Sequence, residues 1–248
     1  MLVLLKTVFY IPLYNGLIFL IGLLPGASVG SAVIVLTLLV KLLLFPLSQK
    51  ASKFQLEMKA HEGEINQIKE RFKNDKQAQG QEILKFYRQN KINPFAGILP
   101  LFVQIPIVIA LYYVFYKGGL PAVDTTLLYP FLSTPIAPDM HFLGIDMGQK
   151  SLLLAILAGI SQFLQAHFAM PPFKPKEKGT QPSFQDDLAR GMQMQMKYFF
   201  PFFMAFVSYA VSGAVAIYFI TSNLFAVGQE LYLRRKFQKE GHLTHPNK

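Results

Sequence analysis

The most constraining feature of this 248-residue chain is an apolar run from Leu17 to Leu47 in which Lys41 is the only charged residue. A charged side chain at membrane depth costs roughly 2.5–3.5 kcal/mol on insertion scales, so it normally faces a polar cavity, a partner or the interface. Several more apolar stretches follow, and each approaches the roughly 20 residues that cross a bilayer. The sequence therefore predicts a polytopic membrane protein in which the surroundings of Lys41 matter most.

Composition narrows the chemistry that the chain can perform. Hydrophobic residues make up 52% of it and charged residues only 15%, and there are no cysteines. A disulfide, a thiol nucleophile, a cysteine metal site and a lipidated cysteine are therefore excluded. Because Trp is also absent, Tyr is expected to supply the aromatic anchors at the membrane interfaces.

We predict an all-α fold with five membrane-spanning helices, because the apolar runs are continuous and lack the alternation of barrel strands. The fourth is short, and only a tight Ser212-Gly213 turn separates it from the fifth, so these two must be antiparallel. Before the first span, residues 1–26 are interrupted by Pro12, Asn15 and Gly16, and we expect them to form an interfacial helix. The five predicted spans cover residues 27–47, 95–116, 151–170, 198–211 and 214–233.

Basic residues indicate the orientation of the spans. Lys and Arg are concentrated in residues 48–93, 171–197 and 234–248, whereas residues 118–149 contain neither. Basic loops remain in the cytoplasm, so the positive-inside rule predicts an N-out, C-in topology. The first two basic segments then form cytoplasmic loops, and residues 234–248 form a basic cytoplasmic tail. Residues 118–149 form an extracytoplasmic loop, which we expect to be irregular with short helical pieces.

Residues 48–93 are predicted to form a cytoplasmic helical hairpin. Asn74-Asp75 and Gly80 provide the expected break. A thin apolar face repeats at helical spacing on both sides of it. This segment is either a solvated connector or a docking arm for a partner with an acidic surface. The apolar positions are Phe54, Met58, Ile65, Ile68, Phe72, Ile83, Leu84, Phe86 and Tyr87.

Polar side chains inside the spans fall at similar depths. Counted from the cytoplasmic end at 1.5 Å per residue, Lys41 lies about 10 Å deep and Gln104 about 14 Å. Gln162 lies about 12 Å deep and Asn223 about 16 Å, and Ser208 is expected at a depth comparable to that of Asn223. Thr37 lies one turn from Lys41 on the same face.

Two interpretations of these polar residues remain open. They could line one hydrated pocket that opens to the cytoplasm, because polar groups in lipid are costly elsewhere. Alternatively, the Gln, Ser and Thr side chains could join neighbouring helices while Lys41 extends to the interface. Their common depth favours the pocket. The predicted pocket residues are Lys41, Thr37, Gln104, Gln162, Ser208 and Asn223.

Three segments resemble the YidC/Oxa/Alb family of membrane protein insertases. They are VLTLLVKLLLFPLSQKAS in the first span, NPFAGILPLFVQIPIVIALYYVFY in the second and SGAVAIYFITSNLFAVGQELYLRR in the fifth. The order of the spans, the hairpin after the first span and the basic tail are similar too. One departure is that the family usually places Arg where this chain has Lys41, which keeps the charge and loses the planar fork of a guanidinium.

This resemblance implies a short-form insertase of the bacterial cytoplasmic membrane, without a large extracytoplasmic domain. Such proteins take a hydrophobic segment of a nascent membrane protein into a cytoplasm-facing groove and release it sideways into lipid. The implied partners are nascent membrane proteins, the ribosome at the hairpin and tail, the Sec translocon and anionic lipids. The residues expected to face lipid and accept the segment are Ile105, Ile109, Phe203 and Tyr218.

Two other functional classes are less well supported by the sequence. An intramembrane enzyme would need paired Asp, Ser with His or a zinc set, and no predicted span contains an Asp. His61-Glu62-Gly63-Glu64 lacks the HExxH spacing. A small transporter is the other alternative, but no inverted repeat is recognisable. We therefore expect a non-enzymatic protein that binds neither a cofactor nor a metal.

Overall fold

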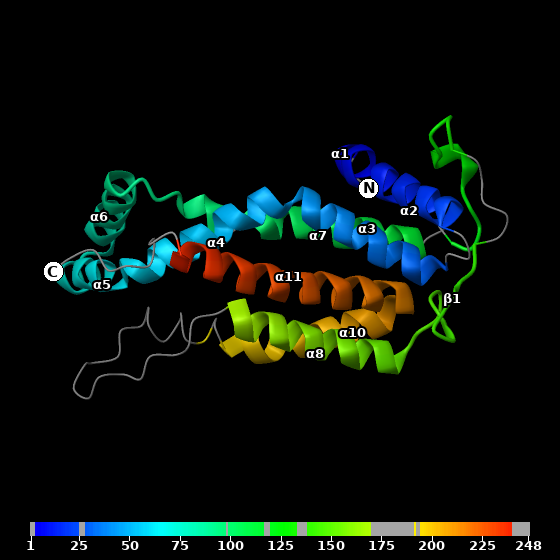
Figure 1. Cartoon of the computed structure of the whole chain (residues 1–248). Coiled ribbons are helices and arrows are strands. Elements are labelled where there is room, and N and C mark those ends of the chain that lie inside the picture. The colour runs from blue at the N-terminus through cyan, green and yellow to red at the C-terminus, as the bar shows by residue number, and fades with distance from the viewer. Residues whose placement is uncertain are drawn as a thin grey trace. The chain divides into compact units, whose positions relative to one another are not determined.

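The computed structural model is mostly helical over the residues that it describes, which are 3–24, 28–97, 99–116, 120–132, 138–169, 191 and 194–239. Figure 1 shows the order of its elements. The chain divides into two compact units. The first comprises Met1–Leu42 and Pro106–Glu230, and the second comprises Leu43–Ile105 and Leu231–Lys248. The predicted all-α class is consistent with this structure.

Prolines mark two of the places where the chain passes between the units. Helix α3 (Val29–Leu43) ends just before Pro46, and α4 (Phe45–Ala60) begins around it. Pro46 has no N–H to donate to the preceding turn, and the amides of Leu47 and Ser48 both donate to the carbonyl of Leu44. Pro106 is the first residue of the first unit on its return and lies inside α7 (Leu99–Tyr116).

The first unit contains a helical bundle. Within it, α8 (Leu152–Ala169) packs along α10 (Phe200–Val211), which follows the short π-helix η4 (Gln195–Phe199). The packing is close because α8 carries Gly159 there: a Cβ at that position would lie 3.1 Å from the Cβ of Ala205. Helix α11 (Gly213–Lys239) then returns antiparallel to α10 (Figure 1).

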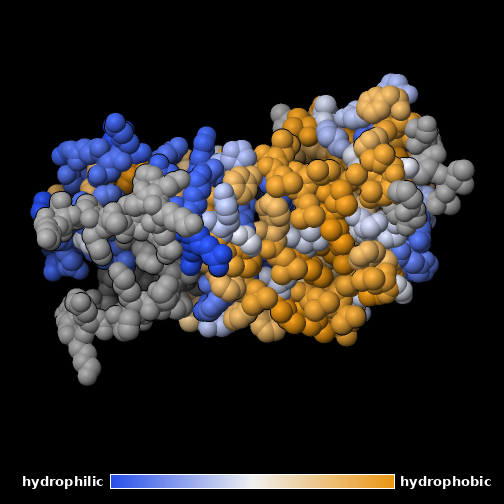
Figure 2. Space-filling view, in the orientation of Figure 1, coloured by the Kyte–Doolittle hydropathy of each residue, from blue (hydrophilic) through white to orange (hydrophobic). Residues whose placement is uncertain are grey.

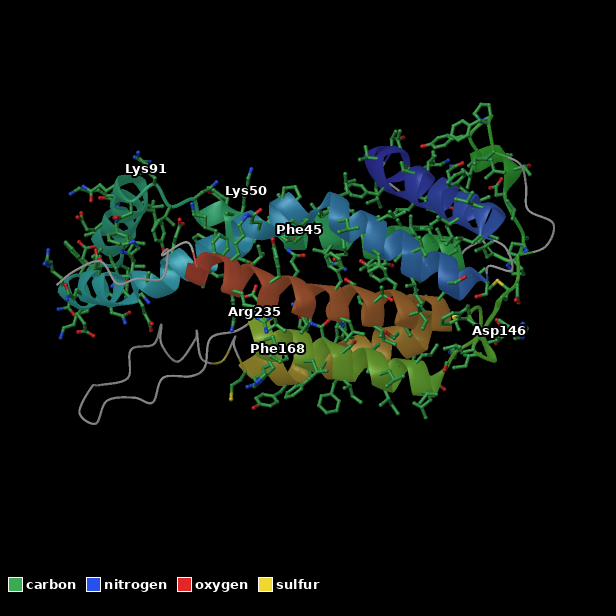
Figure 3. The ribbon with its side chains drawn as sticks, in the orientation of Figure 1. Phe45, Lys50, Lys91, Asp146, Phe168 and Arg235 are labelled. Atoms are coloured by element: carbon green, nitrogen blue, oxygen red, sulfur yellow. The ribbon has the colours of Figure 1, made fainter. Side chains whose placement is uncertain are left out.

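The segment between α7 and α8 accepts hydrogen bonds from the first residues of two helices, α3 and α11. Its β-hairpin pairs β1 (His141–Phe142) with β2 (Ile145–Asp146), a strand pair that the sequence did not predict, and η3 (Thr125–Leu127) is one of the expected helical pieces. The carbonyl of Asp139 accepts from the amide of Val29, at the start of α3. The carbonyl of Gln149 accepts in the same way from Gly213, at the start of α11. Figure 3 shows Asp146 and Phe168 at opposite ends of this bundle.

The N-terminal segment consists of α1 (Val3–Leu5), the π-helix η1 (Lys6–Tyr10) and α2 (Ile11–Leu23). Its inward side is fully buried at Tyr14, Leu17 and Ile18. Beside it, Gly16 approaches α3 so closely that a Cβ would lie 3.1 Å from a methyl group of Leu36. The segment therefore belongs to the packed core of the first unit.

The second unit is built on α4, α5 (Glu62–Arg71), α6 (Lys76–Gln89) and the 3₁₀ turn η2 (Pro94–Gly97). Ile65, Phe86 and Ile92 form its buried core, and partly buried hydrophobic residues pack around them, namely Phe54, Met58, Ile68 and Tyr87. The chain breaks at Asp75, whose carboxylate accepts from the amides of Gln77 and Ala78 and caps α6. Gly80, which we expected to break the chain, lies inside α6.

Three described helices are long and apolar enough to cross a membrane: Lys6–Leu23, Leu152–Ala169 and Gly213–Phe237. A fourth is added if the bent pair Val29–Leu43 and Phe45–Met58 counts as one span. The apolar part of α7 is shorter, at Phe102–Phe115. In Figure 2 the surface over α8 and α10 is apolar, and the surface over α5 and α6 is hydrophilic.

Candidate functional site

The two predicted pocket residues of α3 differ in exposure. The hydroxyl of Thr37 is buried and donates a 2.6 Å hydrogen bond to the carbonyl of Val33, one turn back on the same helix. Lys41 follows one turn later and is half-buried. This spacing places both on one side of α3, as the sequence predicted. Thr37 satisfies its polar hydrogen within its own helix, and Lys41 supplies the charge on this side of α3.

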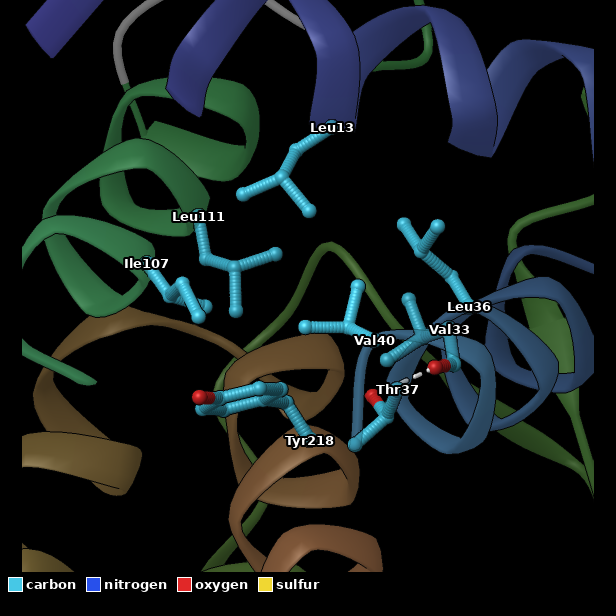
Figure 4. Close-up of a pocket in the computed structure, with 8 residues that line it drawn as sticks. All are labelled: Leu13, Val33, Leu36, Thr37, Val40, Ile107, Leu111 and Tyr218. Carbon is cyan, nitrogen blue, oxygen red and sulfur yellow. Dashed lines mark hydrogen bonds between the residues drawn. The ribbon is translucent and has the colours of Figure 1, made fainter. Parts of the chain in front are cut away.

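A small apolar hollow lies beside Thr37 (Figure 4). It lies between α2, α3, α7 and α11, and its empty volume is about 270 Å³ with its open side included. Thr37 and Tyr218 carry the only polar side-chain atoms among its lining residues, and the Thr37 hydroxyl is turned toward Val33. The other lining residues are aliphatic: Leu13, Val33, Leu36, Val40, Ile107 and Leu111. The wall of this hollow beside Thr37 is therefore almost entirely hydrocarbon.

Tyr218 does not face lipid, which corrects the expectation that it accepts a hydrophobic segment. Its side chain is only 4% exposed, and it borders the hollow beside Thr37. The other three residues expected to face lipid are more open. Ile109 is 37% exposed and Phe203 is 42% exposed in the first unit, and Ile105 is exposed in the second.

A polar pair joins two helices of the bundle. Nδ2 of Asn223 on α11 donates to the hydroxyl of Ser161 on α8 at 3.1 Å, and both side chains are buried. The Ser161 hydroxyl in turn donates to the carbonyl of Ala158 at 2.9 Å. Sequence analysis missed Ser161. Its one signal was its position three residues after Ala158, another small residue on the same side of α8.

The two glutamines of α8 bind each other. Nε2 of Gln162 donates to Oε1 of Gln165 at 2.9 Å, one turn further along the helix. Both side chains are half-buried. Side-chain amides at this spacing partly satisfy one another on a helix surface. Polar groups at this end of α8 are thus present as a matched pair.

Ser208 is fully buried, and it lies nearer the end of its helix than we expected. It is four residues before Ser212, or about 6 Å along the helix, whereas Asn223 is eleven residues after Ser212, or about 16 Å along α11. The expected match in depth therefore does not hold for this residue. Its buried hydroxyl, like that of Ser212, has no hydrogen-bond partner within the described residues.

Gln104 is half-buried on α7 and belongs to the second unit, whereas the other five predicted pocket residues belong to the first. The structure thus brings together Thr37 with Lys41 along α3, and Asn223 with Ser161 across α8 and α11. Whether all six line one pocket stays a prediction.

A second hollow opens between α7, α10 and the start of α11. It holds about 500 Å³ of empty space that includes its open side. Ile109 lies on its wall, and Tyr112 is the only lining residue with a polar side-chain group. The remaining lining residues are valines: Val108, Val207, Val211 and Val215. This hollow is a concave apolar surface beside the partly exposed Ile109.

Known proteins match nearly the whole chain. The family described as 60Kd inner membrane protein matches residues 20–240. The membrane protein insertase YidC of Fusobacterium nucleatum subsp. nucleatum is 33% identical over 207 residues, which cover 84% of this chain and 86% of that protein. The YidC insertase of Clostridium tetani is 33% identical over 217 residues, covering 87% and 86%. That of Francisella tularensis subsp. novicida is 29% identical over 209 residues, covering 84% of this chain and 33% of its own length. The chain therefore belongs to the 60Kd inner membrane protein family.

Proposed function

We propose that this protein inserts nascent hydrophobic segments into the bacterial inner membrane through a groove that contains Lys41. Family membership supports a non-enzymatic insertase, because the matched relatives carry that name. The observation that carries the groove is the half-buried Lys41, one turn from buried Thr37 in a run with no other charge. The groove opens to the cytoplasm, in the five-span, N-out and C-in topology that the basic loops predict.

The physical role of Lys41 is electrostatic. A segment whose leading tail is acidic must carry charge part of the way across hydrocarbon, where a charge is costly. A lysine on the groove wall attracts that tail and shortens the apolar distance that it crosses. The Gln162–Gln165 and Asn223–Ser161 pairs supply further polar groups on α8 and α11 that can exchange partners with the segment.

Release into lipid takes place at the open apolar hollow between α7 and α10. Its valines and Ile109 offer a concave surface to a hydrophobic helix, and Phe203 is partly exposed on α10. Such a surface suits a transient occupant, because apolar side chains hold a helix in the membrane without directional bonds. Tyr218 takes no part in this step, because it is buried beside Thr37.

We further propose that the second unit faces the cytoplasm and meets the machinery that delivers the segment. The hydrophilic surface of α5 and α6 and the basic residues at the end of α11 suit a ribosome carrying the nascent chain. Anionic lipid head groups would bind the same basic residues near the membrane surface. The Sec translocon is a further proposed partner. The protein would insert some segments together with it and others alone.

The test replaces Lys41 and compares two substrates. Lys41→Ala, Lys41→Arg and, as a matched control, Lys50→Ala at an exposed position of α4 are reconstituted into vesicles. They are supplied with single-span proteins that have acidic or neutral tails. Lys41→Ala should reduce insertion of the acidic-tailed protein several-fold and spare the neutral-tailed one, whereas Lys41→Arg and Lys50→Ala should behave like the wild type. Equal insertion of the acidic-tailed protein by Lys41→Ala and wild type would rule out the charge-attraction role.

A further inference from the structure

A short β-hairpin lies at the end of the first unit where α3 and α11 begin (Figure 1). We call residues 138–149, which include this hairpin, the cap. Its backbone meets the start of α3: the amide of Val29 donates to the carbonyl of Asp139 at 2.8 Å, and Ser28 pairs with Asp139 as a parallel β-bridge. The cap and the first residues of α3 are therefore in direct contact.

The cap is held more firmly on its other side, at α11. The amides of Gly213 and Ala214 donate to the carbonyls of Gln149 and Met147 at 2.8 and 2.9 Å, and the Met147 side chain is fully buried. The chain then passes from Gln149 almost directly into α8, which begins at residue 152. Among the described residues, one backbone hydrogen bond joins the cap to α3 and two join it to α11. The α11 side therefore anchors the cap, and the α3 side is the one that can detach.

A phenylalanine ring of the cap lies on the backbone of α3. A Cβ at Gly30 would be 2.5 Å from both Cβ and Cγ of Phe142, so a larger residue at position 30 would displace the ring. Gly30 is seven residues before Thr37 and eleven before Lys41, or about two and three helical turns. All three therefore share one side of α3. Phe142 covers the start of the side that carries Lys41, about 16 Å from that lysine along the helix.

We infer that Phe142 is the gate residue at which the leading tail of an inserted segment leaves the protein, an inference that rests on the proposed function. A tail that follows the Lys41 side of α3 away from the cytoplasm reaches the Phe142 ring before it emerges. The ring must then move off Gly30. A tail too short to reach the ring needs no such movement, so the gate makes insertion depend on tail length.

The hairpin is built to move as one piece. Its two-residue turn has φ angles of 52° at Leu143 and 77° at Gly144, as in the tight type I′ turn that joins two paired strands. The hairpin can therefore swing away from α3 with its own strand pair intact, while the bonds at α11 serve as the pivot. In the resting protein the half-buried Phe142 ring closes this end of α3.

The first test locks the gate. The chain has no cysteine, so a disulfide can be introduced without background. Ser28→Cys with Asp139→Cys joins α3 to the cap, because bridge partners lie within the distance that a disulfide spans. The matched control, His141→Cys with Asp146→Cys, joins β1 to β2 and leaves α3 free.

Both variants are reconstituted into vesicles and supplied with single-span proteins that carry a long tail or a tail of only a few residues. Oxidation of the 28–139 pair should lower insertion of the long-tailed protein several-fold and spare the short-tailed one, and reduction should restore it. Oxidation of the 141–146 pair should change neither. Equal insertion of the long-tailed protein by the oxidised and reduced 28–139 variant, with the disulfide confirmed by mass spectrometry, would overturn the gate and leave the proposed function intact.

A second test needs no substrate. Val33 is buried one turn from Gly30 on the way to Lys41. In spheroplasts, a membrane-impermeant maleimide added from outside should label Val33→Cys several-fold faster when Phe142 is also replaced by Ala. Leu143→Ala, at the exposed tip of the same hairpin, should leave the labelling rate unchanged. An unchanged rate in Phe142→Ala would show that the ring does not close this end of α3, whether or not the protein proves to be an insertase.

Discussion

Asn223 on α11 and Ser161 on α8 form a buried hydrogen bond at 3.1 Å between the two helices. Ser161 acts at the same time as an acceptor from Asn223 and as a donor to Ala158. The pair is therefore asymmetric. Removing Asn223 leaves the serine hydroxyl bonded, whereas removing the hydroxyl leaves a buried amide without the acceptor.

This asymmetry gives the first prediction. Ser161→Ala should lower the free energy of unfolding by about 1–3 kcal/mol, because a buried amide is left unsatisfied. Loss of the bond in Asn223→Ala should lower the free energy of unfolding by less, about 0.6 kcal/mol and at most about 1.7 kcal/mol. A double-mutant cycle in detergent micelles measures the coupling. Equal costs, with no coupling, would show that the pair does not join the helices.

The close approach of α8 and α10 at Gly159 gives the second prediction. A methyl group there would lie 3.1 Å from the Cβ of Ala205 and 3.2 Å from the carbonyl oxygen of Pro201, and that backbone oxygen cannot move aside cheaply. Gly159→Ala should destabilise the protein by about 1–3 kcal/mol despite the better helix propensity of alanine. Gly228→Ala, with nothing within 4 Å, is the control and should stabilise α11 by about 0.5–1 kcal/mol. Thermal unfolding in micelles measures both, and a stabilising Gly159→Ala would show that the helices separate easily.

The sequence predicted some parts of this protein well and others poorly, for physical reasons. The packing of Ile65 and Phe86 could be foreseen because apolar residues in α5 and α6 stand out against charged neighbours. The burial of Tyr218 could not, because α11 is apolar on all sides around it and no periodicity separates a buried face from a lipid-facing one. The hydrogen bonds of Tyr14 and Asn15 were hidden because their partners are backbone groups of a distant loop.

The capped turn at Asp124 gives a pH-dependent prediction. Its carboxylate accepts from the hydroxyl of Thr126 at 2.6 Å and from the amide of Thr126 at 3.0 Å, and these bonds lower the pKa of Asp124. The stabilisation is therefore present above the unfolded pKa of about 3.9 and is lost as the pH falls through the lower folded pKa. In a carboxyl NMR titration, Thr126→Val should raise the pKa of Asp124 and Thr125→Val should leave it unchanged. A pKa that does not respond to Thr126→Val would show that the hydroxyl bond is absent in solution.

The core of the second unit gives the last prediction. Phe86 is buried against Ile65 and Ile92, and its ring lies 5.4 Å from that of His61. Phe86→Ala should cost about 3–5 kcal/mol, because it leaves a cavity in a small core that has few other residues to fill it. Leu84→Ala, on the exposed side of the same helix, should change stability by less than about 0.5 kcal/mol. Hydrogen exchange distinguishes local from global effects: amides of α5 and α6 should lose protection in Phe86→Ala while those of α8 keep theirs, since α8 belongs to the other unit. Loss of protection in α8 as well would show that the two units unfold together.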